Sequence, residues 1–271
     1  MKPALAALGA GAAAAALYYV YKRRLASSLT AVRVLPDKCA LGREAARYVA
    51  ASINAAIAAK GSARVIVATG ASQFEFIAEL VKLPVPWDSV IFFHLDEYCD
   101  LPATHGASFR KYLQERLFTK LQPAPKAVHY LDPISPSKYE ELLAEGAIDM
   151  ACIGIGENGH IAFNDPPPGG ADFADPRLVK KVRLDEACRK QQLGEGWFKT
   201  LSDVPTHAIT LTVPAIMRAE KISCVVPDRR KAEAVRATMH AAISEAVPAT
   251  ILRTHNDCTL WLDEPAASLL K

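Results

Sequence analysis

Short apolar runs rich in β-branched residues alternate along this chain with amphipathic stretches of helical periodicity, and this alternation constrains the fold most strongly. Strands that are apolar on every residue are typical of parallel sheets buried on both faces. We therefore predict an α/β fold: a single doubly wound, mostly parallel sheet with helices on both faces, of Rossmann-like type. The predicted strands are residues 64–68, 90–95, 147–155, 208–213, 222–226 and 258–262, after a first strand near 32–35.

Helical patterns connect these strands. Asp37 begins a pattern with an apolar residue at every fourth position, and Gly61 ends it. Ser72 and Glu75 have the spacing of a capping box, which predicts a helix from that point. Further helices are predicted over residues 108–121, 185–192 and 231–246. Residues 165–206 otherwise form the longest irregular stretch, and a long loop beside a site often acts as a lid.

Composition and charge exclude several classes of protein. The chain has 271 residues, of which 51% are hydrophobic and 23% charged, as in ordinary globular proteins. The formal net charge of +3 is too small to indicate nucleic-acid binding. The six cysteines are far apart and form no C-x-x-C pair, which favours reduced thiols in a cytosolic compartment over disulfides or a zinc site. No internal repeat is present, so we expect one domain over residues 31–271.

Residues 1–30 are an N-terminal extension of different character. Residues 4–21 are almost wholly apolar and rich in alanine, and three cations, Lys22, Arg23 and Arg24, follow at once. The segment is just long enough to span a bilayer, which takes about 17–25 residues, but it is only weakly hydrophobic. Two alternatives stay open: a membrane anchor that leaves the globular domain on the cytosolic side, or an extension lying on the surface.

The segment richest in chemistry is residues 148–168, where a buried strand leads into a glycine-rich turn with His160 and, five residues later, Asp165. A histidine beside a carboxylate is suited to proton transfer. The glycines 154, 156 and 159 also match the G-x-G-x-x-G pattern of dinucleotide-binding proteins, which requires a helix beginning at the third glycine. The prolines at 166–168 would end such a helix, so nucleotide binding is disfavoured. A plain turn whose histidine only caps a strand remains the alternative.

Other strand ends carry polar groups at the edge of the sheet where ligands bind. Residues 69–72 (Thr-Gly-Ala-Ser) offer backbone N–H groups and hydroxyls to an anion, unless they form only a capped turn. Asp96 and Glu97 point in different directions, so one of them can face the crevice as a base. Lys231, in the cluster Arg229-Arg230-Lys231, could reach a phosphate or could be a solvated helix end. Together these groups suit aldose–ketose chemistry on a sugar phosphate.

These residues resemble the glucosamine-6-phosphate deaminase/isomerase family, whose wider superfamily includes 6-phosphogluconolactonase. The resemblance covers residues 31–265 and is carried by four motifs. They are Ala-Thr-Gly-Ala-Ser at 68–72, Phe-His-Leu-Asp-Glu-Tyr at 93–98, Leu-Pro-x-x-His-x-x-Ser at 101–108 and Gly-x-Gly-x-x-Gly-His-Ile-Ala-Phe-Asn-Asp-Pro at 154–166. The continuation His-Ile-Ala-Phe-Asn points to the deaminase branch.

The resemblance implies a role for each catalytic residue. Asp96 would be the general base that moves a proton between C1 and C2, and His160 would open the pyranose ring. Asp165 would orient His160 in place of the family's glutamate. The implied reaction is ring opening, enolisation through a cis-enolamine and hydrolytic loss of ammonia, which gives fructose 6-phosphate in amino-sugar (N-acetylglucosamine) catabolism. No metal or organic cofactor is expected.

The resemblance also implies a set of substrate-binding residues and a small sugar phosphate as partner, with a homo-oligomer as an option. The binding residues are Thr69, Gly70, Ala71, Ser72, Glu97, Gly159, Lys231 and, as the weakest match to the family's phosphate-binding arginine, Arg189.

One departure from the family pattern leaves alternatives open. Many members have an aspartate just before the Gly-His pair, where this chain has Asn158. We assign Asn158 to the catalytic set, but its neutral amide could change the rate or the substrate. A lactone hydrolase of the 6-phosphogluconolactonase type and a non-catalytic sugar-phosphate sensor therefore remain alternatives. Ammonia release, lactone hydrolysis or binding without turnover would distinguish the three.

Overall fold

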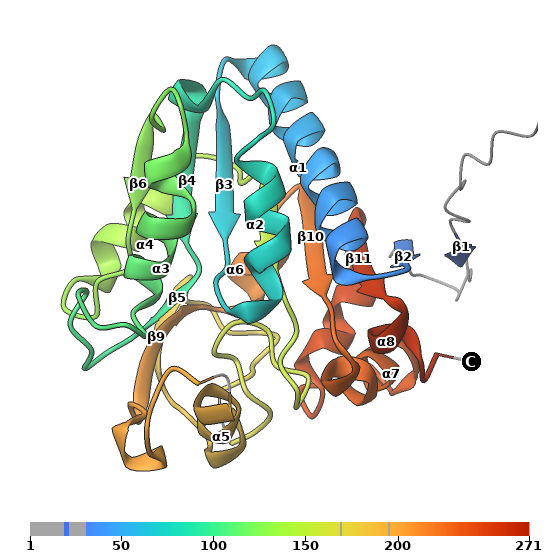
Figure 1. Ribbon diagram of the computed structural model, residues 1–271. Helices are drawn as coiled ribbons and strands as arrows, with labels where there is room; N and C mark the ends of the chain where they lie inside the picture. Colours follow the sequence, from blue (N-terminus) through green and yellow to red (C-terminus); the bar gives the residue numbers. More distant parts are fainter. Residues whose placement is uncertain (1–18, 22–30, 169, 195, 271) are drawn as a thin grey trace, which may run out of the picture.

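The computed structural model describes residues 19–21, 31–168, 170–194 and 196–270, and its centre is a sheet of eight strands (Figure 1). All neighbouring strands are parallel except β1, which runs antiparallel to β2, so the predicted mostly parallel sheet is confirmed. The strands lie in the order β1 (Tyr19–Tyr21), β2 (Ala31–Leu35), β11 (Cys258–Asp263), β10 (Lys221–Val226), β7 (Met150–Ile153), β3 (Ala63–Val67), β4 (Val90–His94) and β6 (Ala127–His129).

The strand order reverses between β3 and β7. From β3 the chain continues outward to β4 and β6, whereas from β7 it continues in the opposite direction to β10 and β11. At such a reversal the two central strands send their following loops apart, which leaves a crevice at their carboxyl ends. The loops that follow Val67 and Ile153 border that crevice.

Helices cover both faces of the sheet, because alternate residues of each strand are apolar on both sides (Figure 1). In β3, Val65 and Val67 belong to the core with the first group of helices, whereas Ile66 belongs to the core with the second. The first group is α1 (Lys38–Lys60), α2 (Phe74–Leu80) and α3 (Phe109–Arg116). The second is α4 (Pro136–Ala144), α6 (Val213–Met217), α7 (Ala232–His240) and α8 (Glu264–Ala267).

Helix α1 confirms its predicted ends. The side chain of Asp37 accepts a hydrogen bond from the N–H of Ala40 (2.8 Å), which satisfies a donor that the first turn leaves free. At the other end Gly61 adopts the left-handed conformation (φ 79°) and donates to the carbonyl of Ile57. Glycine suits this position because it reaches positive φ without the steric cost of a Cβ.

A second, three-stranded antiparallel sheet lies below the carboxyl ends of the main sheet, and the sequence analysis did not predict it (Figure 1). It consists of β5 (Asp96–Tyr98), β9 (His207–Leu211) and β8 (Val179–Arg183). The strand predicted at 208–213 therefore exists outside the main sheet, and the stretch 165–206 is less irregular than expected. In β8 Val179 and Lys180 are both buried, and burial alternates from Lys180 to Arg183, where Val182 packs in a cluster with aromatic side chains and Lys181 and Arg183 are in solvent.

Three helix boundaries differ clearly from prediction: α3 ends at Arg116 instead of residue 121, and the start of α2 and the end of α7 also differ. The capping box at Ser72 is wrong: Ser72 lies within a 3₁₀ helix (Ala71–Gln73), its Oγ accepts from the Gln73 side chain (3.1 Å), and α2 begins at Phe74 without a side-chain cap. Helix α7 ends at His240 instead of residue 246. The guanidinium of Arg253 donates to the carbonyls of Met239 and Ala241 and so satisfies the acceptors exposed where the helix ends.

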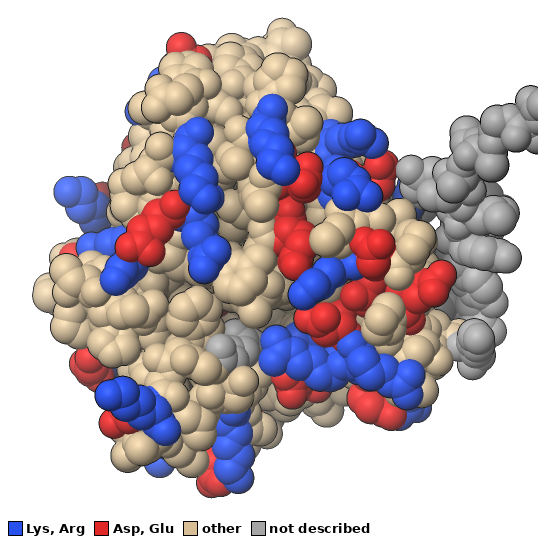
Figure 2. Space-filling view, in the orientation of Figure 1, with Lys and Arg blue, Asp and Glu red and all other residues tan. Residues whose placement is uncertain are grey.

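The predicted membrane-anchor segment lies largely outside the described residues. Of residues 4–21, only β1 at Tyr19–Tyr21 is described, as a strand paired with β2. Among the described residues, no helix combines the length and the apolar character needed to cross a bilayer. On the face shown in Figure 2, basic and acidic side chains are interspersed, which agrees with the small net charge.

Candidate active site

A pocket lies at the carboxyl ends of four adjacent strands, β10, β7, β3 and β4. The loop after β3 contributes Thr69, Gly70 and Ser72, and the end of β4 contributes Asp96. The turn after β7 contributes His160. The segment after β10 contributes Arg230 and Lys231. The pocket therefore occupies the crevice that the reversed strand order creates, and six of the twelve predicted site residues line it.

His160 and Asp165 form the closest charged contact in the pocket. Nδ1 of His160 lies 2.9 Å from Oδ1 of Asp165, and the two side chains are 10% and 0% exposed. Burial acts to raise the pKa of Asp165, but the interactions with His160, Asn158 and the thiol of Cys188 outweigh it and leave the pKa below its usual value. Asp165 is therefore ionised at neutral pH, and it orients the ring that faces the pocket.

Asn158 does not line the pocket but holds both members of this pair. Its Nδ2 donates to Oδ1 of Asp165 (3.1 Å), and its Oδ1 accepts from the backbone N–H of His160 (3.1 Å). An aspartate at this position could accept from His160 but could not donate to Asp165. The amide therefore suits the shorter carboxylate of this chain, because it adds a donor where a second acid would add repulsion.

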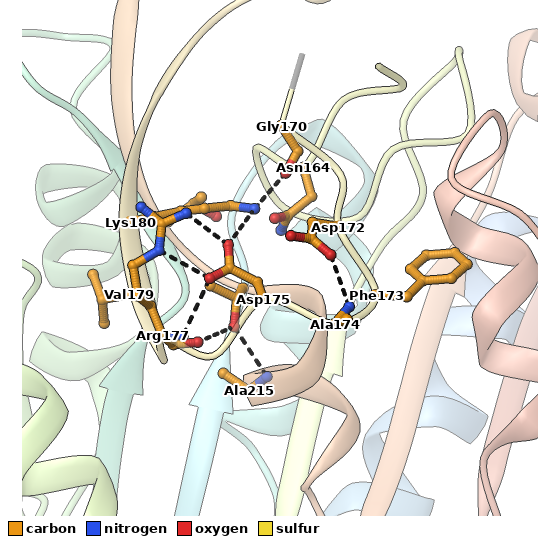
Figure 3. Close-up of polar contacts among 12 residues, drawn as sticks. Asn164, Gly170, Asp172, Phe173, Ala174, Asp175, Arg177, Val179, Lys180 and Ala215 are labelled. Carbon is orange, nitrogen blue, oxygen red and sulfur yellow. Dashed lines mark hydrogen bonds and ion pairs between the residues drawn. The ribbon is translucent and has the colours of Figure 1, made fainter. Parts of the chain in front are cut away.

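A buried ion pair secures the segment that follows Asp165 (Figure 3). Lys180 of β8 donates to the carbonyl of Gly170 and lies 3.2 Å from Oδ2 of Asp175, with both side chains at most 3% exposed. Asp165 in turn accepts from the N–H of Ala171 through its own carbonyl (2.9 Å). The backbone of Asp165 is thus fixed to the second sheet.

Gly156 is required for the position of the imidazole. A Cβ at Gly156 would lie 2.2–2.3 Å from three atoms of the His160 ring, far inside van der Waals contact. The carbonyl of His160 also accepts from the N–H of Gly156 (2.9 Å), so the backbone cannot move away easily. Gly156 therefore serves the close packing of the His160 ring.

We expect Gly156→Ala to lower kcat by about 10²-fold, because a catalytic group misplaced by about 1 Å can cost that much. The matched control is Gly106→Ala, since a Cβ there meets no atom within 4 Å. Steady-state kinetics of both variants, with thermal denaturation to verify folding, give the comparison. Equal activity of the two variants would contradict the assigned role of Gly156.

Asp96 and Glu97 point in different directions, as predicted. Asp96 lines the pocket, whereas the Glu97 carboxylate accepts from the Ser108 hydroxyl (2.9 Å) and from the N–H groups of Tyr98, Phe109 and Arg110. Glu97 is therefore committed to the first turn of α3 and is not brought to the pocket as a substrate-binding group. The same contacts explain why Ser108 belongs to the sequence motif.

The environment of Asp96 matches that of a general base. Its side chain is buried, and burial together with the nearby charge of Glu97 raises the pKa of Asp96 to about 8. A base with a pKa near the working pH combines useful ionisation with strong proton affinity. The described part of the chain places no cation against Asp96 that would lower this pKa.

The prediction that Arg189 binds the phosphate is wrong. The guanidinium of Arg189 donates to the carbonyls of Leu201 and Val204 and does not line the pocket, so Arg189 is not proposed as a phosphate ligand.

Arg230 lines the pocket instead, beside the buried Lys231, and its Nη1 lies 3.5 Å from Glu157. Ala71 and Gly159 also lie outside the lining, next to residues that form it.

Two glutamines that the sequence analysis missed close the pocket from α5 (Glu186–Gly194). Gln191 accepts from the N–H of Glu157 (2.9 Å), and Gln192 accepts from the Tyr98 hydroxyl (2.8 Å). No local pattern marks them, because α5 is positioned by tertiary packing against the second sheet. Arg230 did have a signal: it adjoins Lys231 in a cationic cluster at a strand end.

Comparison with known proteins agrees with the geometry. The family model described as glucosamine-6-phosphate isomerases/6-phosphogluconolactonase matches residues 36–163. Glucosamine-6-phosphate deaminases of Bacillus thuringiensis (strain Al Hakam) and Bacillus cereus (strain AH820) are each 38% identical over 210 residues, which is 75% of this chain and 76% of theirs.

Solved structures give the same result. A monomeric glucosamine-6-phosphate deaminase has a TM-score of 0.79 and 30% identity, over 88% of this chain and 99% of its own. A 6-phosphogluconolactonase from Thermotoga maritima has a TM-score of 0.69 at 19% identity, over 86% of this chain and 99% of its own, which shows a shared fold. The chain belongs to the glucosamine-6-phosphate isomerase/6-phosphogluconolactonase family.

Proposed function

We propose that this protein is a glucosamine-6-phosphate deaminase, which converts glucosamine 6-phosphate and water into fructose 6-phosphate and ammonia. The observation that carries the proposal is the presence, in one pocket, of a base with a raised pKa, a His–carboxylate pair and a cationic side. The isomerisation step needs the base, and the ring-opening step needs the His–carboxylate pair. The cationic side of the pocket suits the phosphate of the sugar. The reaction belongs to amino-sugar catabolism.

His160 serves the ring-opening step. The imidazole lines the pocket and has a buried, ionised carboxylate behind it, so it can take the proton of the C1 hydroxyl and return one to the ring oxygen. Asp165 stabilises the positive charge that the ring gains during this transfer and keeps its orientation fixed. Asn158 acts through Asp165 and is a positioning residue.

Asp96 serves the isomerisation step. Its carboxylate removes the proton from C2 of the open-chain amino sugar and delivers it to C1, so that an enolamine forms between the two transfers. Water then hydrolyses the carbon–nitrogen bond at C2, which releases ammonia and gives the ketose. Burial makes Asp96 a stronger base than an exposed aspartate, because it raises the pKa of the carboxyl group to about 8.

Lys231, Arg230 and the loop 69–72 form the phosphate-binding side. We expect Lys231→Ala to raise KM for glucosamine 6-phosphate by about 10- to 100-fold, because a hydrogen bond to a charged group contributes about 1.5–3 kcal/mol. The control is Arg229→Ala, an exposed neighbour in the same cluster that does not line the pocket. An unchanged KM in Lys231→Ala would limit that lysine to a structural role.

One pair of assays tests the proposed function. Purified full-length protein is given glucosamine 6-phosphate or 6-phosphogluconolactone, and the release of ammonia or the hydrolysis of the lactone is measured. We expect ammonia release only. Lactone hydrolysis would identify the protein as the alternative enzyme, and binding of the sugar phosphate without either product would identify a sensor.

We also propose that residues 31–271 are the complete catalytic domain, that residues 1–30 are an appendage, and that the enzyme acts in the cytosol. All six cysteines lie in the described part of the chain and are free thiols, which supports a reducing compartment. Without β1, strand β2 keeps its parallel pairing with β11.

A chain beginning at Ala31 is therefore expected to fold and to retain full activity. Circular dichroism and the ammonia assay check this, and an aggregated or inactive product would refute it. Sedimentation of both chains with lipid vesicles tests whether the extension contacts a membrane, and light scattering gives the oligomeric state.

A further inference from the structure

Cys188 has no part in the proposed reaction, yet it lies against the catalytic pair. It belongs to the first turn of α5, is 1% exposed, and directs its thiol toward the Asp165 carboxylate, where it contributes to the interactions that keep Asp165 ionised. Its backbone N–H is bound by Asp185 (2.5 Å), which fixes this part of the helix. A sulfur atom at this position calls for an explanation beyond packing.

His160, Asp165 and Cys188 together present one imidazole nitrogen, one carboxylate oxygen and one sulfur, all within 4.8 Å of one another. All three residues are buried. Nδ1 of His160 and Oδ2 of Asp165 are inaccessible to solvent, and neither completes a hydrogen bond of regular geometry in the part of the chain that the structure describes. The three ligand atoms therefore surround a small shared space with binding capacity to spare.

The donor set and its dimensions suit zinc. Zinc binds histidine, carboxylate and cysteine with bonds of about 2.0–2.3 Å, so a tetrahedral ion holds its ligand atoms about 3.3–3.6 Å apart. Atoms already within 4.8 Å reach these separations by moving about 1 Å. Of the three ligand residues, His160 lines the pocket, so a water or a sugar oxygen bound there is the candidate fourth ligand.

We propose that His160, Asp165 and Cys188 form an inhibitory binding site for Zn²⁺. The ion replaces the thiol proton of Cys188, which passes to solvent. The imidazole proton between His160 and Asp165 moves to the other ring nitrogen, so the histidine binds as a neutral ligand, and no electron is transferred. The inhibition rests on the proposed function, since a metal-bound His160 can no longer exchange a proton with the sugar. Mg²⁺ is not expected to bind, because it prefers oxygen ligands in octahedral geometry.

Direct metal binding tests the site without reference to activity. Full-length protein freed of metal with a chelator is titrated with Co²⁺, whose thiolate complexes absorb through sulfur-to-metal charge transfer, and Zn²⁺ is then added to displace it. Cys188→Ser keeps a hydroxyl donor beside Asp165 but removes the sulfur ligand. Cys39→Ser is the control, because Cys39 is an exposed thiol that does not line this pocket.

We expect one Zn²⁺ per chain, a charge-transfer band in the unmodified protein and in Cys39→Ser, and no band in Cys188→Ser. Zinc affinity in Cys188→Ser should fall at least about tenfold, since the loss of outer-shell partners alone costs about 10- to 100-fold. Zinc should inhibit ammonia release in the first two proteins, reversibly with chelator, and much less in Cys188→Ser, each compared with its own metal-free rate. Mg²⁺ at the same concentration should inhibit none of them.

A missing charge-transfer band in the unmodified protein, or equal zinc affinity in Cys188→Ser, would overturn the site. If Cys188→Ser does not fold, as judged by circular dichroism, the cobalt spectrum of the unmodified protein decides. A protein that shows the band but releases no ammonia would refute the proposed function and leave the zinc site established.

Discussion

Asp96→Asn is expected to lower kcat for glucosamine 6-phosphate by about 10²–10⁴-fold, the usual contribution of a positioned base, while KM changes little. The amide has the size of the carboxylate but cannot take the C2 proton. Asp96 lines the pocket but is not one of the groups assigned to the phosphate, so its loss should not weaken substrate binding strongly. Steady-state kinetics at saturating substrate measure the effect.

The control is Asp100→Asn, the same chemical change at an exposed position four residues away. The pH profile adds a second readout. The raised pKa means that Asp96 is protonated below about pH 8, so kcat/KM should rise with pH through about 8 in the parent protein. A kcat of Asp96→Asn within a few-fold of the parent, or an identical pH profile, would remove Asp96 from the role of base.

His160→Gln is expected to cost about 10²–10⁴-fold with the cyclic sugar phosphate and much less with an open-chain analogue, because the open-chain form does not need the ring-opening step. Glutamine can still form hydrogen bonds but cannot exchange a proton near neutral pH. Rates with both compounds, measured on the same preparation, give the comparison.

His240→Gln serves as control, since His240 is exposed at the end of α7. Equal losses on the cyclic and the open-chain compound would assign His160 to binding or to a later step. A loss confined to the cyclic compound would confirm that the His160–Asp165 pair opens the ring.

The sequence predicted six of the eight strands of the central sheet, because each of these six is a local signal; β1 and β6, of three residues each, were not predicted. The runs at 64–68 and 222–226 are apolar on nearly every residue, which only a sheet covered on both faces requires, and the structure places both in the parallel sheet. The ends of α1 were equally local, since Asp37 and Gly61 act within four residues of themselves.

The second sheet could not be predicted in the same way. Strand β8 reads Val-Lys-Lys-Val-Arg, and its buried Lys180 is acceptable only because Asp175 and the Gly170 carbonyl meet it in the folded protein (Figure 3). A short edge strand with three charged residues has little hydrophobic alternation in its sequence. It is not recognisable as a strand until its partner β9 is known.

In the site too, residues marked by local sequence patterns were predicted correctly, whereas residues positioned by tertiary contacts were not. Asp96 comes two residues after β4, and His160 and Asp165 lie in the segment after β7, so the topology brings Asp96 and His160 to one pocket with Asp165 behind the histidine. Arg189 was misplaced because the direction of a side chain on α5 depends on the segment 201–204, which supplies carbonyls for its guanidinium. The place of Arg230 depends likewise on the turn between β10 and α7.

The central claim is that this pocket isomerises and deaminates an amino-sugar phosphate by removing the C2 proton. The most direct measurement gives full-length protein glucosamine 6-phosphate labelled with deuterium at C2 and follows ammonia, sugar product and label together. The account predicts one fructose 6-phosphate for each ammonia, with the label moved from C2 to C1 or to water. Ammonia released with the label still at C2, or no ammonia at all from folded protein, would contradict it.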